Sequence, residues 1–158
     1  MAYNDIIWVE NTNIRYTNFS GAESNYNPLG KRNFNLDIPD DRLQEFYDLR
    51  LNIKETKPDA EGNVRHYVKV DVNYNPPRGI SKPQINLYLG DTYTELDEDT
   101  VQELDRIDIE SVNCGFRLYK YNEHGDCSAK LVELQVFARE SPFMKRHREY
   151  LQSHGIQE

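Results

Sequence analysis

The stretch that decides the predicted fold is Cys114-Gly115-Phe116-Arg117-Leu118-Tyr119-Lys120-Tyr121. Side chains alternate between the two faces of a β-strand, so this pattern places Phe116 and Leu118 on one face. Arg117, Tyr119 and Tyr121 then lie on the other face. Two flat rings and a guanidinium on one face need either a covering layer of the protein's own chain or a ligand with flat faces and negative charge.

The same stretch begins a predicted long hairpin. Its strands cover residues 112–121 and 129–138, a turn at 122–126 joins them, and Val132, Leu134 and Val136 are expected to point inward. Other alternating strands are predicted at residues 6–9, 13–19, 32–38, 66–74 and 82–89, and short helices at 40–49 and 94–107. Asp40 or Asp41, and Thr94 or Asp97, are the expected helix caps. This arrangement predicts a mainly β fold with one or two short helices. Its most suitable architecture is a small antiparallel OB-like barrel, although periodicity alone does not distinguish that barrel from a jelly roll.

The length of 158 residues predicts one domain with tails rather than two domains. We expect an OB-like domain at residues 1–140 and a tail at 141–158 that is either a short helix or disordered. No apolar run is long enough to span a membrane and the start of the chain does not resemble a secretion signal, which predicts a cytoplasmic protein. Cys114 and Cys127 are expected to be free thiols, with Cys114 facing the core.

The net charge of −8 at first argues against a nucleic-acid ligand, because phosphate binding requires cations. The charge is concentrated, however, between Asp91 and Glu110, where nine acidic residues accompany one basic residue, Arg106. The rest of the chain holds 18 acidic and 18 basic residues. A neutral body can still present a basic groove if its cations gather on one side.

Catalytic and metal-binding patterns are absent from the sequence. The four histidines share no metal-ligand spacing with each other or with the two cysteines, and there is no phosphate-binding glycine loop, nucleophile elbow or HExxH helix. The sequence therefore predicts a protein that is not an enzyme and that requires no metal or cofactor.

Four separate segments place a tyrosine ring near a cation, a combination that suits single-stranded nucleic acid because bases stack on rings and cations contact phosphates. The candidate stacking residues are Tyr26, Tyr67, Tyr74, Tyr119 and Tyr121, and the candidate phosphate contacts are Lys31, Arg32, Lys69, Arg78, Arg117 and Lys120. Lys120 shares the inward direction of Leu118, so it must lie beyond the rim of the core to reach a ligand. The alternative is that the tyrosines are ordinary strand formers and that the cations keep the surface soluble.

From Ile14 to about Phe137, the order of features resembles phage single-stranded DNA-binding proteins of the OB-fold type. The resemblance rests on the loop and strand at residues 24–34 and on the late hairpin at residues 116–122 and 129–134. It implies a protein that coats single-stranded DNA during phage replication and recombination, with replication or recombination proteins as further partners. Because stacking on tyrosine does not depend on which base is present, we expect binding without sequence preference. Many members of that family end in an acidic tail, whereas this chain has Lys145-Arg146-His147-Arg148 near its end and its acidic segment is internal.

Two rival functions remain open from the sequence. The acidic segment at residues 91–110 could mimic nucleic acid in an inhibitor or interaction protein that blocks a host nuclease or defence complex, or it could be only a solvated face. A carbohydrate-binding sandwich would also use exposed tyrosines. The first of these rivals is the main alternative to single-stranded DNA binding.

Overall fold

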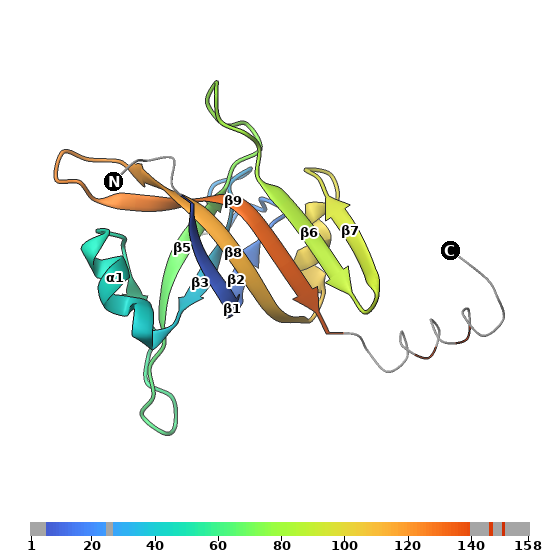
Figure 1. The fold of residues 1–158 in the computed structure, drawn as a ribbon, viewed down its shortest axis with the longest axis horizontal. Coiled ribbons are helices and arrows are strands. Elements are labelled where there is room, and N and C mark those ends of the chain that lie inside the picture. Colours follow the sequence, from blue (N-terminus) through green and yellow to red (C-terminus); the bar gives the residue numbers. More distant parts are fainter. Residues whose placement is uncertain (1–5, 25–26, 140–145, 147–149, 151–158) are drawn as a thin grey trace.

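The computed structural model describes residues 6–24, 27–139, 146 and 150, and its fold is drawn in Figure 1. The described residues form nine strands, which belong to a single sheet, together with one α-helix and two short 3-10 helices. The strands are β1 (Ile7–Thr12), β2 (Ile14–Asn18), β3 (Arg32–Ile38), β4 (Lys54–Glu55), β5 (His66–Val72), β6 (Gln84–Leu89), β7 (Thr92–Leu96), β8 (Ile109–Lys120) and β9 (Cys127–Ala138). The helical segments are η1 (Asp40–Arg42), α1 (Leu43–Asp48) and η2 (Val101–Arg106).

The strand order β1-β8-β9-β5-β3-β2 confirms the prediction of a mainly β, OB-like fold, but the sheet is open and not the closed barrel that we expected. β1 and β2 are the two ends of this order, and only Asn13 separates them in the chain. At this bend the pairing register shifts between Val9 and Thr12, and Asn11 has a φ of 51°. Asparagine tolerates this left-handed conformation better than most residues, so the chain can bend sharply here. The bend carries the chain from one edge of the sheet to the other, and β1 and β2 do not pair with each other to close a barrel.

β9 is the strand at which the sheet branches. Its first half pairs in parallel with β5 at Ala129 and Lys130, and its second half pairs in parallel with β6 from Glu133 to Ala138. The remaining ladders are antiparallel, so the expectation of a wholly antiparallel sheet is wrong at these two ladders. Figure 1 shows the result: the tip of the β8–β9 hairpin and α1 lie at one end of the molecule, and the β6–β7 hairpin lies at the other.

The predicted inward residues of the middle strands form the core. Phe34, Leu36 and Val70 are fully buried, and they pack with the large rings of Phe19 and Phe116. Phe46 of α1 covers this core and meets Phe116 edge-on, with ring centroids 5.9 Å apart. Cys114 is a free thiol on the core face, as predicted, and burial raises its pKa.

A bulge in the β8–β9 hairpin reverses one predicted direction. Gly115 pairs with Glu133, but the next residue, Phe116, pairs with Leu131, so Val132 has no partner in the ladder. Leu134 and Val136 point inward as expected, whereas Val132 is partly exposed and Leu131 is buried instead. An extra residue on one strand changes the alternation of every side chain beyond it.

Two predicted helices also differ in detail. The chain from Asp40 to Asp48 is helical, but its first helical residue follows Pro39 and no side chain caps it. The predicted helix at residues 94–107 is wrong in its first part, because Thr92–Leu96 is the strand β7 and only Val101–Arg106 is helical. Asp97 instead holds the intervening turn, and its hydrogen bonds from Thr100 lower its pKa. Cross-strand pairing with β6 outweighs the weak helical spacing of these residues.

Candidate nucleic-acid interface

The β8–β9 hairpin presents the side chains that the sequence places on its outward face. Phe116 and Leu118 are buried, whereas Tyr119 and Tyr121 are 50% and 54% exposed and Arg117 is partly buried. The predicted directions of these five side chains are therefore confirmed, and about half of each of the two tyrosines is open to solvent.

The sheet register adds neighbours to this row. Arg117 and Asp71 both pair with Lys130, Tyr119 pairs with Ser128, and Lys69 lies on β5 with the outward parity of Asp71. We call the surface made by these side chains the outer face; its residues are Tyr67, Lys69, Asp71, Arg117, Tyr119, Tyr121, Ser128 and Lys130. The ammonium group of Lys130 lies 5.4 Å from the centroid of the Tyr119 ring and 2.7 Å from Oδ2 of Asp71. Lys130 thus brings a cation beside an exposed ring.

Lys130 was missed by the sequence analysis for a physical reason. Val132 and Leu134 were predicted to point inward, and a regular strand would then have turned Lys130 inward too. The bulge at Val132 reverses this alternation, so Lys130 reaches the outer face. A bulge in the middle of a strand has no reliable signature in the sequence, although Gly115 opposite it is a weak signal.

Arg117 differs from the other partly buried arginines of the described chain. Each of the others has a carboxylate partner: Arg15 with Asp37 at 3.1 Å, Arg32 with Glu98 at 3.5 Å and Arg42 with Glu45 at 2.7 Å. In residues 6–24 and 27–139, no hydrogen bond or ion pair joins the Arg117 side chain to another residue. A partly buried charge is unfavourable without compensation, so this guanidinium is suited to an anion that comes from outside the chain.

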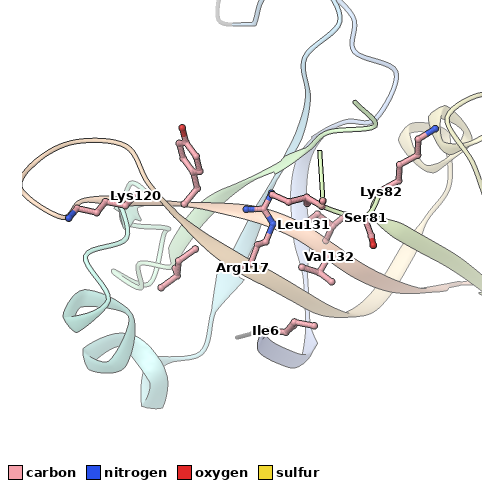
Figure 2. Close-up of a pocket in the computed structure, with 11 residues that line it drawn as sticks. Ile6, Ser81, Lys82, Arg117, Lys120, Leu131 and Val132 are labelled. Atoms are coloured by element: carbon pink, nitrogen blue, oxygen red, sulfur yellow. The ribbon is translucent and has the colours of Figure 1, made fainter. Parts of the chain in front are cut away.

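A pocket of about 570 Å³ adjoins Arg117, and Figure 2 shows its lining. The pocket lies between the loop at residues 79–82, the start of the described chain at Ile6 and the β8–β9 hairpin. Its residues are Ile6, Gly79, Ile80, Ser81, Lys82, Arg117, Leu118, Tyr119, Lys120, Leu131 and Val132. In Figure 2 the side chain of Arg117 lies in the middle of this group, whereas Lys120 extends along the hairpin away from it.

A second, smaller pocket lies on the other side of the hairpin. It has a volume of about 200 Å³ and its lining includes Lys54, Lys69, Asp71, Tyr121 and Ser128. Tyr119 and Lys130 stand between the two pockets, because Tyr119 lines the first and Lys130 contacts Asp71 of the second. The outer face therefore extends from the larger pocket, across the exposed ring of Tyr119, to the smaller pocket.

Two predicted residues lie in a different setting. Tyr74 is only 5% exposed, and the guanidinium of Arg32 covers its ring at 5.1 Å from the centroid. Arg32 also donates to the carbonyl of Phe19 and contacts Glu98. Burial is the main cause that raises the pKa of Tyr74 to about 12. This geometry does not favour the predicted roles of either residue, because the ring has no open face and the cation is already engaged.

The remaining predicted residues are placed as follows. Lys31 and Arg78 are exposed on loops, Lys69 is exposed on the outer face, and Tyr67 is partly buried there. Lys120 is exposed at the end of β8, beyond the buried Leu118, as its predicted role requires. Tyr26 lies outside the described residues. The structure thus gathers Tyr67, Lys69, Arg117, Tyr119 and Tyr121 on the outer face. It places Lys120 at the pocket beside Arg117 but not on this face, and it leaves Arg32 and Tyr74 apart from both.

The acidic segment at residues 91–110 is engaged within the chain at several points. Asp105 accepts hydrogen bonds from the backbone of Phe19 and Ser20, and Glu98 and Asp108 contact Arg32 and Arg139 respectively. Asp97 holds its own turn. Carboxylates with these internal roles fit a structural, solvated segment better than a mimic of nucleic acid.

No group of three or more histidine, cysteine, aspartate or glutamate side chains within the described ranges is placed to hold a metal ion. Among the helices described, none has the length and apolar character needed to cross a membrane.

Residues 2–142 match the model of the protein family described as "Putative phage ssDNA-binding domain". The chain belongs to this family. The match covers most of the sequence, including every strand of the sheet, and agrees with the resemblance that the loop at residues 24–34 and the late hairpin indicate. No curated protein matches the sequence significantly.

Two solved structures show the same fold as this member of the phage ssDNA-binding family. One is the single-stranded DNA-binding protein from bacteriophage Enc34 with a C-terminal truncation, which shares 17% identity at a TM-score of 0.54, covering 87% of this chain and 88% of that chain. The other is the bacteriophage Enc34 protein in complex with ssDNA, with 15% identity and a TM-score of 0.50, covering 87% of this chain and 89% of that chain.

Proposed function

We propose that this protein binds single-stranded DNA on the outer face, by stacking bases on Tyr119 and Tyr121 and by contacting phosphates with Arg117, Lys130 and Lys69. The observation that carries the proposal is the pair of exposed rings beside a partly buried arginine with no partner in the described chain. Membership in the phage ssDNA-binding family supports this function, as does the ssDNA complex of the bacteriophage Enc34 protein, whose fold is similar.

The chemistry of the outer face suits binding of single-stranded DNA without sequence specificity. Stacking on an aromatic ring contributes about 1–3 kcal/mol per base and works with any base, because each base has a flat face. The cations add a contribution that depends on salt, since each neutralised phosphate of a single strand changes the slope of log affinity against log salt by about 0.7. Such a protein would protect exposed strands during phage replication and recombination without catalysing a reaction.

A titration with a fluorescently labelled oligo-deoxythymidine tests the proposal. We expect binding at about 50 mM salt that weakens steeply by about 200 mM, because counterion release drives phosphate contacts. Affinity for a neutral oligosaccharide would not show this dependence. Failure to bind the oligonucleotide at the lower salt concentration would refute the proposed function.

The double substitution Tyr119→Ala and Tyr121→Ala tests the location. Loss of two stacking rings should lower the affinity about 30-fold or more, if each contributes at least about 1 kcal/mol. Tyr93→Ala is the matched control, because Tyr93 is 55% exposed but lies on β7, in the hairpin at the opposite end of the molecule (Figure 1). An affinity of the double variant within twofold of the control would show that the strand binds elsewhere.

A further inference from the structure

The larger pocket has a lining that sets it apart from the rest of the outer face. Its volume of about 570 Å³ lies within the range of about 300–1,000 Å³ that is typical of small-molecule sites. Ile80, Leu131 and Val132 supply apolar surface, and Lys82 and Arg117 supply cations. None of its lining residues in the described chain is acidic, although the protein carries a net charge of −8. This combination suits a flat, apolar group that is attached to an anion.

The pocket exists because two strands change their pairing at the same place. β1 pairs with β8 only as far as Phe116, so β8 has an unpaired edge from Arg117 onward in the described chain. On the other side of β8, the bulge lifts Val132 out of the ladder. The loop at residues 79–82 then closes the hollow before β6 joins β9 at Glu133.

We propose that one nucleotide of the bound strand leaves the base stack and inserts its base into this pocket, while its phosphate contacts Arg117. This inference rests on the proposed function and deepens it, because it assigns a second mode of binding to a specific place. Tyr119 lines the pocket and also belongs to the outer face, so a neighbouring base can stack on its ring as the inserted base turns away.

The placement of charge favours the larger pocket over the smaller one for this role. The smaller pocket contains Asp71, whose carboxylate repels a phosphate and already holds Lys130 at 2.7 Å. In the larger pocket Arg117 has no partner in the described chain and the loop adds Lys82. An apolar floor excludes water from the base, and the cations compensate the charge of the phosphate.

The first test is a titration of the full-length protein with deoxythymidine 5′-monophosphate, followed by the backbone amide signals in NMR spectra. We expect saturable shifts at Ser81, Leu118 and Val132, and binding of thymidine without phosphate that is about tenfold or more weaker, because a charge-assisted contact is lost. Shifts confined to residues outside the pocket, or no shifts at millimolar nucleotide, would overturn the inference.

The second test fills the pocket with a side chain. Ser81→Trp places an indole in the hollow from an exposed loop, so the fold should be preserved. Ala60→Trp adds the same group to the exposed turn at residues 59–63, which contributes nothing to the lining of the pocket. We expect Ser81→Trp, but not Ala60→Trp, to abolish the nucleotide shifts and to weaken oligo-deoxythymidine binding about fivefold or more, the equivalent of about 1 kcal/mol for one base.

The outcomes separate the two proposals. If the Ser81→Trp protein binds the oligonucleotide within twofold of the Ala60→Trp protein, no nucleotide of the strand needs the pocket and the inference is wrong, while single-stranded DNA binding stands. If neither the unmodified protein nor the Ala60→Trp protein binds the oligonucleotide, the proposed function itself fails.

Discussion

Replacing Arg117 by glutamine should weaken DNA binding without lowering the stability of the folded protein, and no other single change on the outer face should distinguish these two effects as clearly. The guanidinium has no carboxylate partner in the described chain, so its removal breaks no ion pair and leaves no buried carboxylate without compensation. The melting temperature of the free protein should therefore stay the same or rise slightly. Arg15→Gln, in contrast, should lower it, because Asp37 loses a contact of 3.1 Å.

The effect of Arg117→Gln on DNA binding should be large. A hydrogen bond between charged groups contributes about 1.5–3 kcal/mol, which corresponds to a loss of affinity of about 10- to 150-fold. The slope of log affinity against log salt should also decrease in magnitude by about 0.7, the contribution of one phosphate in a single strand. Fluorescence anisotropy of a labelled oligo-deoxythymidine at four or more salt concentrations measures both quantities.

Arg106→Gln is the matched control, because it removes the same charge from an exposed position of η2. It should change the affinity only slightly, through the weak long-range field of the protein. The reasoning would be refuted if Arg117→Gln and Arg106→Gln gave the same affinity and the same salt slope, since the guanidinium would then make no phosphate contact.

Three further predictions concern charge, packing and pH. Asp71→Asn should strengthen oligonucleotide binding about two- to tenfold at low salt and little at high salt, because it frees Lys130 from its ion pair. The loss of that ion pair should lower the free energy of unfolding by about 0–1 kcal/mol. Anisotropy measures the change in affinity, and thermal melting measures the change in stability. Gly115→Ala should destabilise the fold by about 1–3 kcal/mol in urea titrations, because the new methyl carbon would lie 2.9 Å from the indole of Trp8, and adding Trp8→Leu should recover part of this loss. Stability should fall as the pH rises from about 10 to about 12, because the phenol of Tyr74 ionises first in the unfolded chain, and Tyr74→Phe should flatten this decline in urea titrations at several pH values.

The direction of the late strand could be determined from the sequence alone because alternation is a local property. Phe116 and Leu118 are apolar and flank Arg117 and Tyr119, so burying the apolar pair fixes the other pair outward. The same reasoning found the middle strands and the helical turn at residue 46. In each case a side chain's direction depends only on its neighbours in the chain.

The members of the candidate site that the sequence analysis missed depend on events that are not local. Lys130 reaches the outer face only because a bulge opposite Gly115 reverses the alternation of β9. The pocket beside Arg117 requires that the β1–β8 ladder end at the pair Ile7–Phe116 and that the loop at residues 79–82 line the same hollow as Leu131 and Val132. These segments are far apart in the chain.

The sequence by itself therefore determined most of the strands, the inward and outward residues of β3, β5 and β8, and the repeated pairing of rings with cations. Only the tertiary structure decided which of these pairs meet: it gathered Tyr119, Lys130 and Arg117 on one surface and buried Tyr74 beneath Arg32. The physical reason is that alternation fixes the face of a strand on which a side chain lies, whereas strand order, register and bulges fix its neighbours, and these depend on how the whole chain packs.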